Sequence, residues 1–401
     1  MLNLEHVSFT YAGNQAPSLT DCNLCLKPGE MLLLCGSSGC GKTTLTRLVN
    51  GLIPAQIPGQ LTGRICLDGQ DLTDLPLWRR SDMVGSVFQN PKTQFFNLDT
   101  ISELAFSLEN RGVPRAQMQA RLQAVAEAFQ LEPLLERSVF ELSGGEQQRI
   151  ALAAAYTQNP DIYVLDEPSA NLDEQEILRL QQLLGQLKRQ GKSILIAEHR
   201  TWYLKDLIDQ AIFLAAGEMA RQWTGADFAQ LTPAACAYWG LRSVQRVKCC
   251  VKPACAAKEG AAGLPAKSTK GLSVRQLSVK RQQRYLCTDL SFEMPRGQVV
   301  VLQGCNGAGK SSLARVLCGL NKAQAGQIYL DGKKLGPRAL RQKSFMIMQE
   351  VNYQLFSDSV LAQARLGNHC SEAEALRVLT ELQLEGLIQR HPLSLSGGQK
   401  Q

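Results

Sequence analysis

One stretch decides the fold of this 401-residue chain, GSSGCGKT at Gly36–Thr43. It follows the apolar run Met31–Cys35 and precedes Thr44–Asn50, whose apolar residues have helical spacing. A strand, a glycine-rich loop closed by Lys and Thr, and a helix in this order are typical of a phosphate-binding loop. The glycines let successive backbone N–H groups turn towards phosphate oxygens, and the helix start adds partial positive charge. The sequence therefore predicts a nucleoside-triphosphate site.

Each residue type in this loop has an expected task. Lys42 can reach the β and γ phosphates, and the Thr43 hydroxyl is a suitable Mg²⁺ ligand. Cys40 lies among inward N–H groups at a helix start, which favours a reactive thiol, although a Cys that merely fills a small-residue position is the alternative. The residues expected to contact the nucleotide are Gly36, Ser37, Ser38, Gly39, Cys40, Gly41, Lys42, Thr43 and Thr44.

The chain repeats this pattern in its second half. GCNGAGKS at Gly304–Ser311 follows the apolar run Val299–Leu302, which we expect to be the equivalent strand. Three other stretches recur in the same order: Gly63–Gly69 and Gly326–Gly332, Val87–Gln89 and Ile347–Gln349, and Leu142–Gln148 and Leu395–Gln401. Four such pairs indicate a duplicated domain. The second loop adds the expected nucleotide contacts Gly304, Gly307, Gly309, Lys310, Ser311 and Ser312.

The order of apolar and helical segments predicts the fold class. Short β-branched runs alternate with helical stretches, which favours α/β units on a mostly parallel sheet. We expect strands at Ile162–Leu165, Ser193–Ala197 and Ala211–Leu214, and helices at Ala116–Phe129 and Glu174–Arg189. The predicted organisation is a complete P-loop NTPase domain at residues 1–235, a basic linker at 236–271 and a second such domain at 272–401.

The second copy is expected to be incomplete. It stops at Gln401, and no segment corresponds to Arg149–Leu214 of the first copy. A sheet without its central strand would leave hydrogen-bonding edges and an apolar face bare. We therefore expect a truncated or fragmentary copy, with a protease-sensitive C-terminal half.

Composition excludes several classes of protein. Hydrophobic residues make up 44% and charged residues 20%, which is a globular balance. No apolar run is long enough to span a membrane, and the start lacks the pattern of a signal peptide. The 13 cysteines read as reduced thiols, and a metal site at Cys249, Cys250 and Cys255 is the weaker alternative.

The net charge of +7 is concentrated in one region. Residues 242–296 contain twelve Lys or Arg but three Asp or Glu, so the remaining chain is close to neutral. This distribution excludes a protein-wide nucleic-acid surface. A solvated linker is favoured, and contact with anionic lipid headgroups is the alternative.

Two acids and a histidine follow apolar strands in the first copy. Ile162–Leu165 leads into Asp166 and Glu167, and His199 follows Ser193–Ala197. We expect Asp166 to hold Mg²⁺ through water, Glu167 to polarise the attacking water as general base, and His199 to reach the γ-phosphate.

With these motifs and LSGGEQQR at Leu142–Arg149, the sequence resembles the ATP-binding cassette (ABC) family. The resemblance implies ATP as the nucleotide, with Gln89 touching Mg²⁺ and sensing the γ-phosphate. It places Tyr11 where the family stacks an aromatic ring on adenine, although a half-buried strand residue is the alternative. Ser169–Asp173 resembles the D-loop through which paired domains communicate.

Within this family, two runs resemble energy-coupling factor transporter ATPases, including their tandem form. They are QNPKTQFF at Gln89–Phe96 and AEHR at Ala197–Arg200. The resemblance implies import of a vitamin or transition-metal ion through a membrane scaffold and a substrate-binding membrane subunit, at the cytoplasmic face of the membrane. Phe95 and Phe96 are candidates for the docking groove, and packing within a helical subdomain is the alternative.

The resemblance also implies head-to-tail pairing of cassettes, within one chain or between two. Each signature then serves the opposite loop, and its residues are Ser143, Gly144, Gly145 and Glu146 in one copy and Ser396, Gly397, Gly398 and Gln399 in the other. The second nucleotide site has Lys310, Ser311 and Gln349 but no acid strand or histidine, so weak binding and little hydrolysis are expected there. Arg281 occupies the position of Tyr11, and Tyr285 is the alternative aromatic.

Two other functions remain open. A soluble tandem ABC ATPase acting on ribosomes or nucleic acid is disfavoured, because the connector is broken by Pro253, Gly260, Gly263 and Pro265. A non-hydrolysing regulatory subunit is disfavoured by Glu167 and His199. The sequence does not name a solute.

Overall fold

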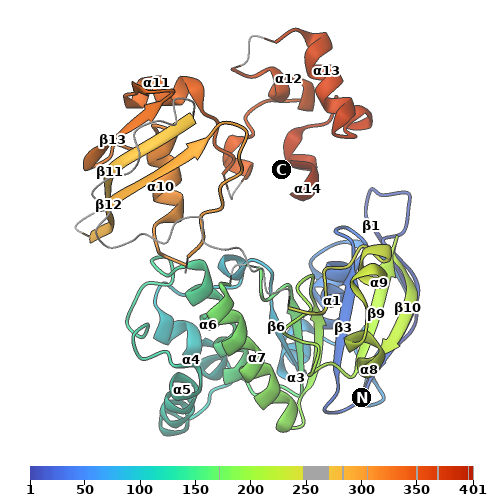
Figure 1. The fold of residues 1–401 in the computed structure, drawn as a ribbon. Helices are drawn as coiled ribbons and strands as arrows, with labels where there is room; N and C mark the ends of the chain where they lie inside the picture. Colours follow the sequence, from blue (N-terminus) through green and yellow to red (C-terminus); the bar gives the residue numbers. More distant parts are fainter. Residues whose placement is uncertain are drawn as a thin grey trace. The chain divides into compact units, whose positions relative to one another are not determined.

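A computed structural model describes residues 1–170, 172–246, 271–281, 284–304, 306–348, 351–367, 370–395 and 397–400. The chain divides into two compact units, Met1–Ala254 and Cys255–Gln401, and each is described by itself. Strands and helices alternate along the chain, which confirms the predicted α/β class (Figure 1). Within the described residues, no helix is both long and apolar enough to span a bilayer.

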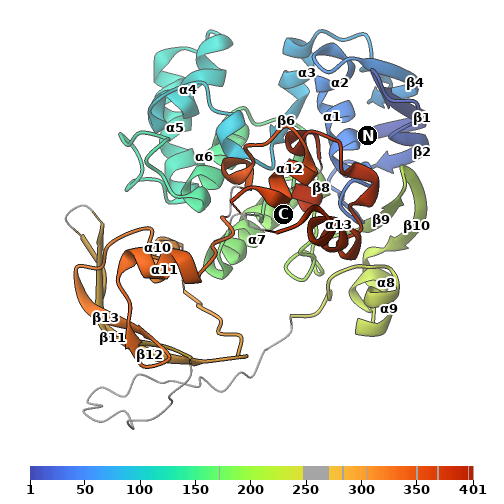
Figure 2. The same cartoon turned by 90° about the horizontal axis from the view of Figure 1, so that it is seen from above.

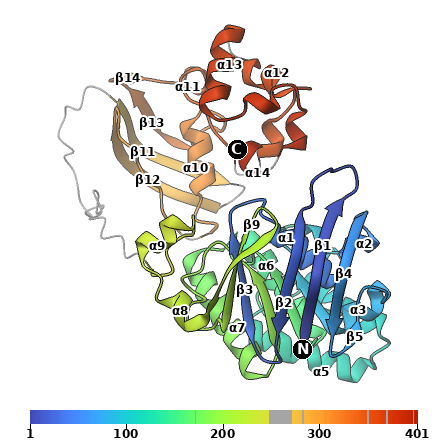
Figure 3. The same ribbon diagram turned by 90° about the vertical axis from the view of Figure 1, so that its right-hand side faces the viewer.

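The first unit contains two sheets. Its strands are β1 (Leu2–Tyr11), β2 (Leu19–Leu26), β3 (Met31–Gly36), β4 (Gly59–Leu67), β5 (Gln70–Asp71), β6 (Val84–Val87), β7 (Ile162–Asp166), β8 (Ser193–Ala197), β9 (Gln210–Ala215) and β10 (Glu218–Thr224). The antiparallel sheet has the order β2-β1-β4-β5, and the other has the order β10-β9-β3-β8-β7-β6. Strands β3, β6, β7, β8 and β9 are parallel, as predicted. Figure 3 shows β2, β1 and β4 of the antiparallel sheet side by side.

Helices cover the sheets of the first unit. They are α1 (Lys42–Asn50), α2 (Leu52–Ala55), α3 (Leu77–Met83), η1 (Pro91–Thr93), α4 (Thr100–Asn110), α5 (Arg115–Phe129), α6 (Gly144–Thr157), α7 (Glu174–Arg189), α8 (Gly225–Ala229) and α9 (Pro233–Tyr238). Figure 2 shows α4, α5 and α6 grouped on one side and β1, β2 and β4 on the other. The expected helices at 116–129 and 174–189 are confirmed within one residue at their starts.

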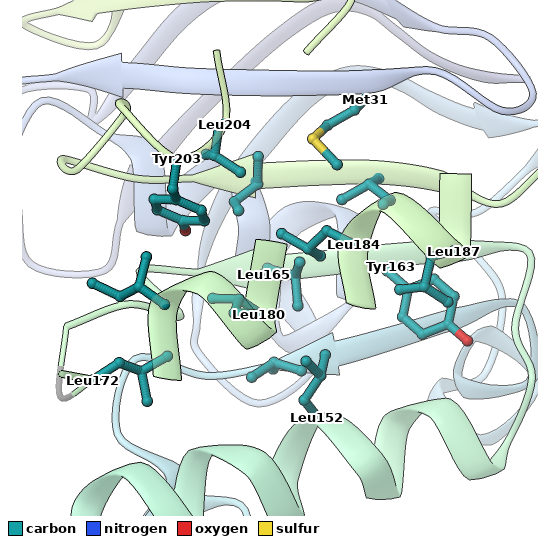
Figure 4. Packing of buried hydrophobic residues seen from close by; sticks show 14 of the residues in the cluster. Met31, Leu152, Tyr163, Leu165, Leu172, Leu180, Leu184, Leu187, Tyr203 and Leu204 are labelled. Atoms are coloured by element: carbon teal, nitrogen blue, oxygen red, sulfur yellow. The ribbon is translucent and has the colours of Figure 1, made fainter. Parts of the chain in front are cut away.

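The apolar core explains why the parallel strands have continuous apolar sequences. Every residue of β3, β7 and β8 is buried, as expected for strands covered on both faces. Leu180, Leu184 and Leu187 of α7 pack in one cluster with Tyr163 and Leu165 of β7 (Figure 4). The carboxyl ends of these strands are thereby held in fixed positions relative to one another.

The end of the first unit corrects the predicted linker boundary. Cys236 and Val244 are buried in the core of this unit, although both lie within the expected linker at residues 236–271. Trp223 and Trp239 stack edge to face at 5.6 Å and hold this segment against β10. Alanine and cysteine favour a linker by composition, but here they form α9 and its contacts. Residues 247–270 lie outside the described part.

The second unit is smaller and has an antiparallel sheet of order β12-β11-β13-β14. Its strands are β11 (Gly271–Arg281), β12 (Arg284–Pro295), β13 (Ala325–Leu330) and β14 (Lys333–Lys334). Its helices are α10 (Lys310–Leu317), α11 (Pro337–Lys343), η2 (Val351–Gln354), α12 (Val360–Arg365), α13 (Glu372–Glu381), η3 (Glu385–Leu387), η4 (Pro392–Ser394) and α14 (Gly397–Lys400). Leu313 and Val316 of α10 pack against Val274 and Leu277 of the sheet.

The strand expected at Val299–Leu302 is wrong. These residues have no regular structure, and 92% of Val299 and 72% of Val301 are exposed. In the first unit, β3 pairs with β8 on one edge and β9 on the other. Among the described residues of the second unit, no strand pairs with Val299–Leu302. An apolar run becomes a strand only where neighbours take up its backbone hydrogen bonds.

Candidate functional site

The phosphate loop connects β3 to α1, as the sequence predicts. Gly36 has φ +144° and Gly41 has φ +109°, both within the range that side chains rarely adopt. A Cβ at Gly41 would lie 2.7 Å from Leu19 Cδ2 and 2.9 Å from the Ser18 carbonyl oxygen. The loop therefore needs glycine at these positions, and its backbone can approach a ligand closely.

Lys42 is almost fully buried beneath this loop, with 4% of the residue exposed. Its Nζ donates hydrogen bonds to the carbonyl oxygens of Gly36 at 2.9 Å and Ser37 at 2.8 Å. The thiol of Cys40 is also buried, with Sγ 3.7 Å from Nζ of Lys42. The ammonium group is thus held at the centre of the loop, where phosphate oxygens would lie.

Thr43 and Asp166 meet at the carboxyl end of the sheet. The Thr43 hydroxyl donates a hydrogen bond to Asp166 Oδ1 at 3.2 Å. Burial raises the pKa of the Asp166 carboxyl, and the hydrogen bond from Thr43 opposes that shift. A hydroxyl and a carboxylate oxygen at hydrogen-bonding distance are a donor set that fits Mg²⁺.

Three expected catalytic residues come together beside this pair. Gln89 Nε2 donates a hydrogen bond to Glu167 Oε2 at 3.0 Å, and His199 Nε2 lies 3.2 Å from Glu167 Oε1. They follow three different parallel strands, β6, β7 and β8, and the sheet brings them to one edge. Glu167 has φ +47°, an uncommon conformation for a residue with a side chain and one that recurs at functional sites.

The environment of Glu167 favours its ionised form. Burial alone would raise the pKa of this carboxyl. The hydrogen bond and charge of His199, the charge of Lys42 and the amide of Gln89 outweigh burial, so that the pKa lies below its ordinary value. A carboxylate that stays ionised can accept a proton from water, as a general base must.

Tyr11 ends β1 close to the start of α1. Its hydroxyl lies 2.9 Å from Thr44 Oγ1, and its ring packs edge to face on Phe9 at 4.9 Å. The ring is half-buried. Tyr11 is therefore a half-buried strand residue, as one interpretation expects, and its role as an adenine platform remains a prediction.

The signature stretch forms the start of α6. Ser143 is the N-cap and forms a capping box with Glu146, whose carboxylate accepts from the Ser143 N–H at 2.7 Å. A Cβ at Gly145 would collide with the carboxylate of Glu176 in α7, so this glycine permits the helices to approach closely. Gly144 completes the exposed helix start that the sequence predicts to face another cassette.

The second unit reproduces part of the phosphate loop. Lys310 Nζ donates a hydrogen bond to the Gly304 carbonyl oxygen at 2.7 Å, as Lys42 does to Gly36. Gly309 has φ +92°, and a Cβ there would lie 2.9 Å from Leu286 Cβ. Several expected residues lie outside the described part of the chain: Gln349, Ser396, the side chain of Arg281, the D-loop residue Asn171, and Cys249, Cys250 and Cys255.

Two supporting residues were not predicted. Gln94 Oε1 accepts from the Phe88 N–H at 3.2 Å and its Nε2 donates to the Ser86 carbonyl at 3.1 Å, which braces the segment before Gln89. Glu198 is buried beside His199. An acid next to a histidine at the end of an apolar strand was a signal that could have identified Glu198. Within the described residues, no group of three His, Cys, Asp or Glu residues is placed to hold a metal ion.

The structure separates the two phenylalanines that the sequence treats together. Phe95 packs against the main core of the first unit. Phe96 is 77% exposed and stacks on Phe106 at 5.1 Å. Phe96 therefore remains a candidate for partner contact, and Phe95 does not.

Comparison with known proteins agrees with this geometry. The family described as ABC transporter matches residues 19–170 and 287–401. An ABC transporter ATP-binding protein of Treponema denticola is 45% identical over all of this chain and 82% of its own length. The HMP/thiamine import ATP-binding protein YkoD of Bacillus subtilis is 32% identical over all of this chain and 77% of its own length.

Solved structures give the same result for one unit. The ATP-binding cassette MJ0796, solved as a dimer with ADP and Pi, has a TM-score of 0.51 and 26% identity, covering 56% of this chain and 98% of that chain. The protein cbiO1 of Clostridium perfringens, part of the complex cbiONQ, has a TM-score of 0.51 and 25% identity, covering 57% and 90%. The chain belongs to the ABC transporter family and is an ATP-binding cassette ATPase with two family segments.

Proposed function

We propose that this chain hydrolyses ATP at Glu167 to power import of a small solute, of the vitamin or transition-metal-ion class, through separate membrane subunits. The observation that carries the proposal is the meeting of Gln89, Glu167 and His199 next to the phosphate loop. Similarity to an HMP/thiamine import protein supports a vitamin as the solute. Similarity to cbiO1, which is part of the complex cbiONQ, supports work together with other transporter subunits.

The proposed reaction uses the polar groups at the sheet edge. Lys42 stabilises charge on the β and γ phosphates from its buried position. Glu167, which its surroundings keep ionised, accepts a proton from the attacking water as the general base. His199 holds Glu167 on one oxygen and Gln89 holds it on the other. The carboxylate is thereby aimed before substrate arrives.

Magnesium fits the residues present. Thr43 and Asp166 would supply the oxygen atoms that hold the ion, Asp166 through a water molecule. The expected contact of Gln89 with the ion remains a prediction. When bound, Mg²⁺ neutralises phosphate charge and orients the β and γ phosphates.

Cassette pairing and membrane partners are part of the proposal. The capped start of α6 at Ser143 would close over the nucleotide of another cassette, in the same chain or a second one. Phe96 of the first unit and Phe356 of the second occupy corresponding positions and are 77% and 74% exposed. They would contact the membrane scaffold, and a substrate-binding membrane subunit would choose the solute. These partners would hold the chain at the cytoplasmic membrane face.

The decisive test is Glu167→Gln. We expect kcat for ATP hydrolysis to fall by about 1000-fold or more while ATP binding persists, because only the base is lost. Glu5→Gln, on an exposed position of β1, is the matched control and should retain full activity. A Glu167→Gln protein that hydrolyses ATP at the parent rate would refute the proposed chemistry.

Membrane coupling needs its own test. Phe96→Ser should weaken assembly with the membrane scaffold in detergent and lower solute uptake, with basal ATPase activity unchanged. Trp78→Ser is the control, because Trp78 is an aromatic residue of α3 that is also exposed, at 65%. Equal losses in both variants, or none in either, would contradict the assignment of Phe96.

A further inference from the structure

Glu198 is a buried carboxylate between two turns of the first unit. Only 2% of the residue is exposed, yet its two oxygens accept four hydrogen bonds. Oε1 accepts from the backbone N–H groups of His199 at 2.8 Å and Arg200 at 3.0 Å. Oε2 accepts from the Ser169 N–H at 3.2 Å and the Tyr203 hydroxyl at 2.9 Å. A buried carboxylate is tolerated when its acceptor positions are filled in this way.

The two turns carry the proposed catalytic pair. The acid turn (residues 167–170) begins with Glu167, and the histidine turn (residues 198–201) contains His199. Their side chains are 3.2 Å apart, and the Glu167 N–H donates to the Ala197 carbonyl at 2.8 Å. Glu198 therefore joins the turn of the base to the turn of the histidine.

Arg200 holds the backbone of the same residue, Ser169, at its carbonyl. Its Nη1 donates to the carbonyl oxygens of Ser169 at 3.4 Å and Leu172 at 3.3 Å. Ser169 is thus held at its N–H by Glu198 and at its carbonyl by Arg200. The acid turn cannot shift without disturbing the histidine turn.

We propose that Glu198 is a positioning residue that keeps His199 in contact with Glu167. It does not touch the reacting atoms. This inference rests on the proposed function, because it takes Glu167 and His199 as the catalytic pair. Its physical basis is geometric: each end of the 3.2 Å contact is anchored by a different oxygen of one rigid carboxylate.

Glu198→Gln removes the connection with little change of shape. An amide has one accepting oxygen, so its NH₂ group must face one of the two donor pairs. The less costly orientation places NH₂ towards Tyr203, whose hydroxyl can rotate and accept, and leaves the Ser169 N–H without an acceptor. The turn at His199 and Arg200 stays bonded. The variant therefore detaches the acid turn selectively.

We expect Glu198→Gln to lower kcat for ATP hydrolysis about 10- to 100-fold, with the dissociation constant for ATP within about twofold of the parent value. Tyr203→Phe is the matched control. It removes the other donor to the same oxygen but leaves the Ser169 bond, so kcat should stay within about twofold. Equal losses of kcat in the two variants would show that any change at the buried Glu198 site lowers activity. The hydrogen bond to Ser169 would then have no special role.

A double-mutant cycle shows whether Glu198 acts through His199. In a His199→Ala protein measured by single-turnover hydrolysis, adding Glu198→Gln should lower the rate by less than about twofold. Multiplied losses would overturn the inference, as would a Glu198→Gln protein with the parent kcat. If Glu198→Gln fails to fold, Arg200→Gln is the substitute, because it removes the hydrogen bond from the histidine turn to the Ser169 carbonyl at a half-exposed residue. Its loss of kcat should likewise disappear in the His199→Ala protein.

Failure of this inference is distinguishable from failure of the proposed function. If Glu167→Gln abolishes hydrolysis and Glu198→Gln leaves it intact, only the positioning role is lost. If Glu167→Gln leaves hydrolysis intact, the catalytic pair itself is wrong.

Discussion

The two phosphate-loop motifs share one residue pattern but differ in what supports them. In the first unit, β3 leads into the loop and is hydrogen bonded on both edges. In the second, Val299–Leu302 leads into the loop without regular structure and is exposed. Both lysines nevertheless bond to the first glycine carbonyl of their loops. The motif therefore determines the hydrogen bonds within the loop, and the sheet determines the structure of the segment that leads into it.

A second pair of segments differs much less between the units. Gln94 accepts from the Phe88 N–H, and Gln354 accepts from the Met348 N–H at 2.8 Å. Asp99 caps α4, and Ser359 caps α12 at the corresponding position. These interactions join residues close in sequence. Local hydrogen bonds therefore recur in both units. Among the described residues, strand pairing with distant segments occurs at the strand before the first loop and not at Val299–Leu302.

Hydrogen exchange should show the largest difference between the units. The buried amides of β3 can exchange only when the sheet opens. In the described structure, residues 299–302 are exposed to solvent. We expect exchange in β3 to be slower by about 1000-fold or more, as for core strands. Mass spectrometry of peptides covering the two loops measures this. Similar protection in both would contradict the comparison.

Substituting each loop lysine should show which nucleotide site carries the ATPase activity. Lys42→Ala is expected to lower ATP hydrolysis by about 100-fold or more, because a buried charge at the phosphates is lost. Lys310→Ala should change hydrolysis by less than about twofold, since its loop lacks a supporting strand in the described structure. Steady-state assays with each variant suffice, and equal losses would mean that both loops support turnover.

Core substitutions should separate the units by stability. Leu33→Ala removes a fully buried side chain from β3 and should cost about 3 kcal/mol. Val301→Ala, on a residue 72% exposed, should cost less than about 0.5 kcal/mol. All four tryptophans lie before residue 240, so their fluorescence in urea follows unfolding of the first unit. Hydrogen exchange of β11 amides follows unfolding of the second unit. A large cost at Val301 would show that this residue is buried in solution.

The helix caps of α4 and α12 should show the smallest difference between the units. Only the pH dependence of their contribution to stability should differ. Asp99→Ala and Ser359→Ala should each cost about 1 kcal/mol at pH 7. The backbone hydrogen bond from Ser102 lowers the pKa of Asp99, so its contribution is complete above the unfolded pKa and is lost as pH falls through the folded one. The cost of Asp99→Ala should therefore shrink near pH 3, and that of Ser359→Ala should not. Urea unfolding at both pH values provides the comparison.

Sequence reasoning predicted the first unit well because its signals reinforce one another. Continuous apolar runs predicted β3, β7 and β8, and the spacing of glycines predicted the loop between β3 and α1. The same reasoning failed at Val299–Leu302, where an apolar run had no partner strand. It also failed at Cys236, because composition does not show whether a segment packs on a core.

The chemical groups of the site were readable from sequence, but their contacts were not. Acids and a histidine at strand ends indicated Asp166, Glu167 and His199. The 3.2 Å approach of His199 to Glu167, and the burial of Glu198 behind it, depend on the register of β7 against β8. Single residues at strand ends carry no sign of which neighbour they will meet.

By itself, the sequence determined the phosphate loop and the repeat, because a loop depends on residue types a few positions apart and a repeat on matching motifs. Only the tertiary structure decided which loop is supported, which phenylalanine is exposed and how Gln89, Glu167 and His199 meet. Those outcomes depend on pairings between segments tens of residues apart, whose free energy comes from burial and shared hydrogen bonds that no local pattern encodes.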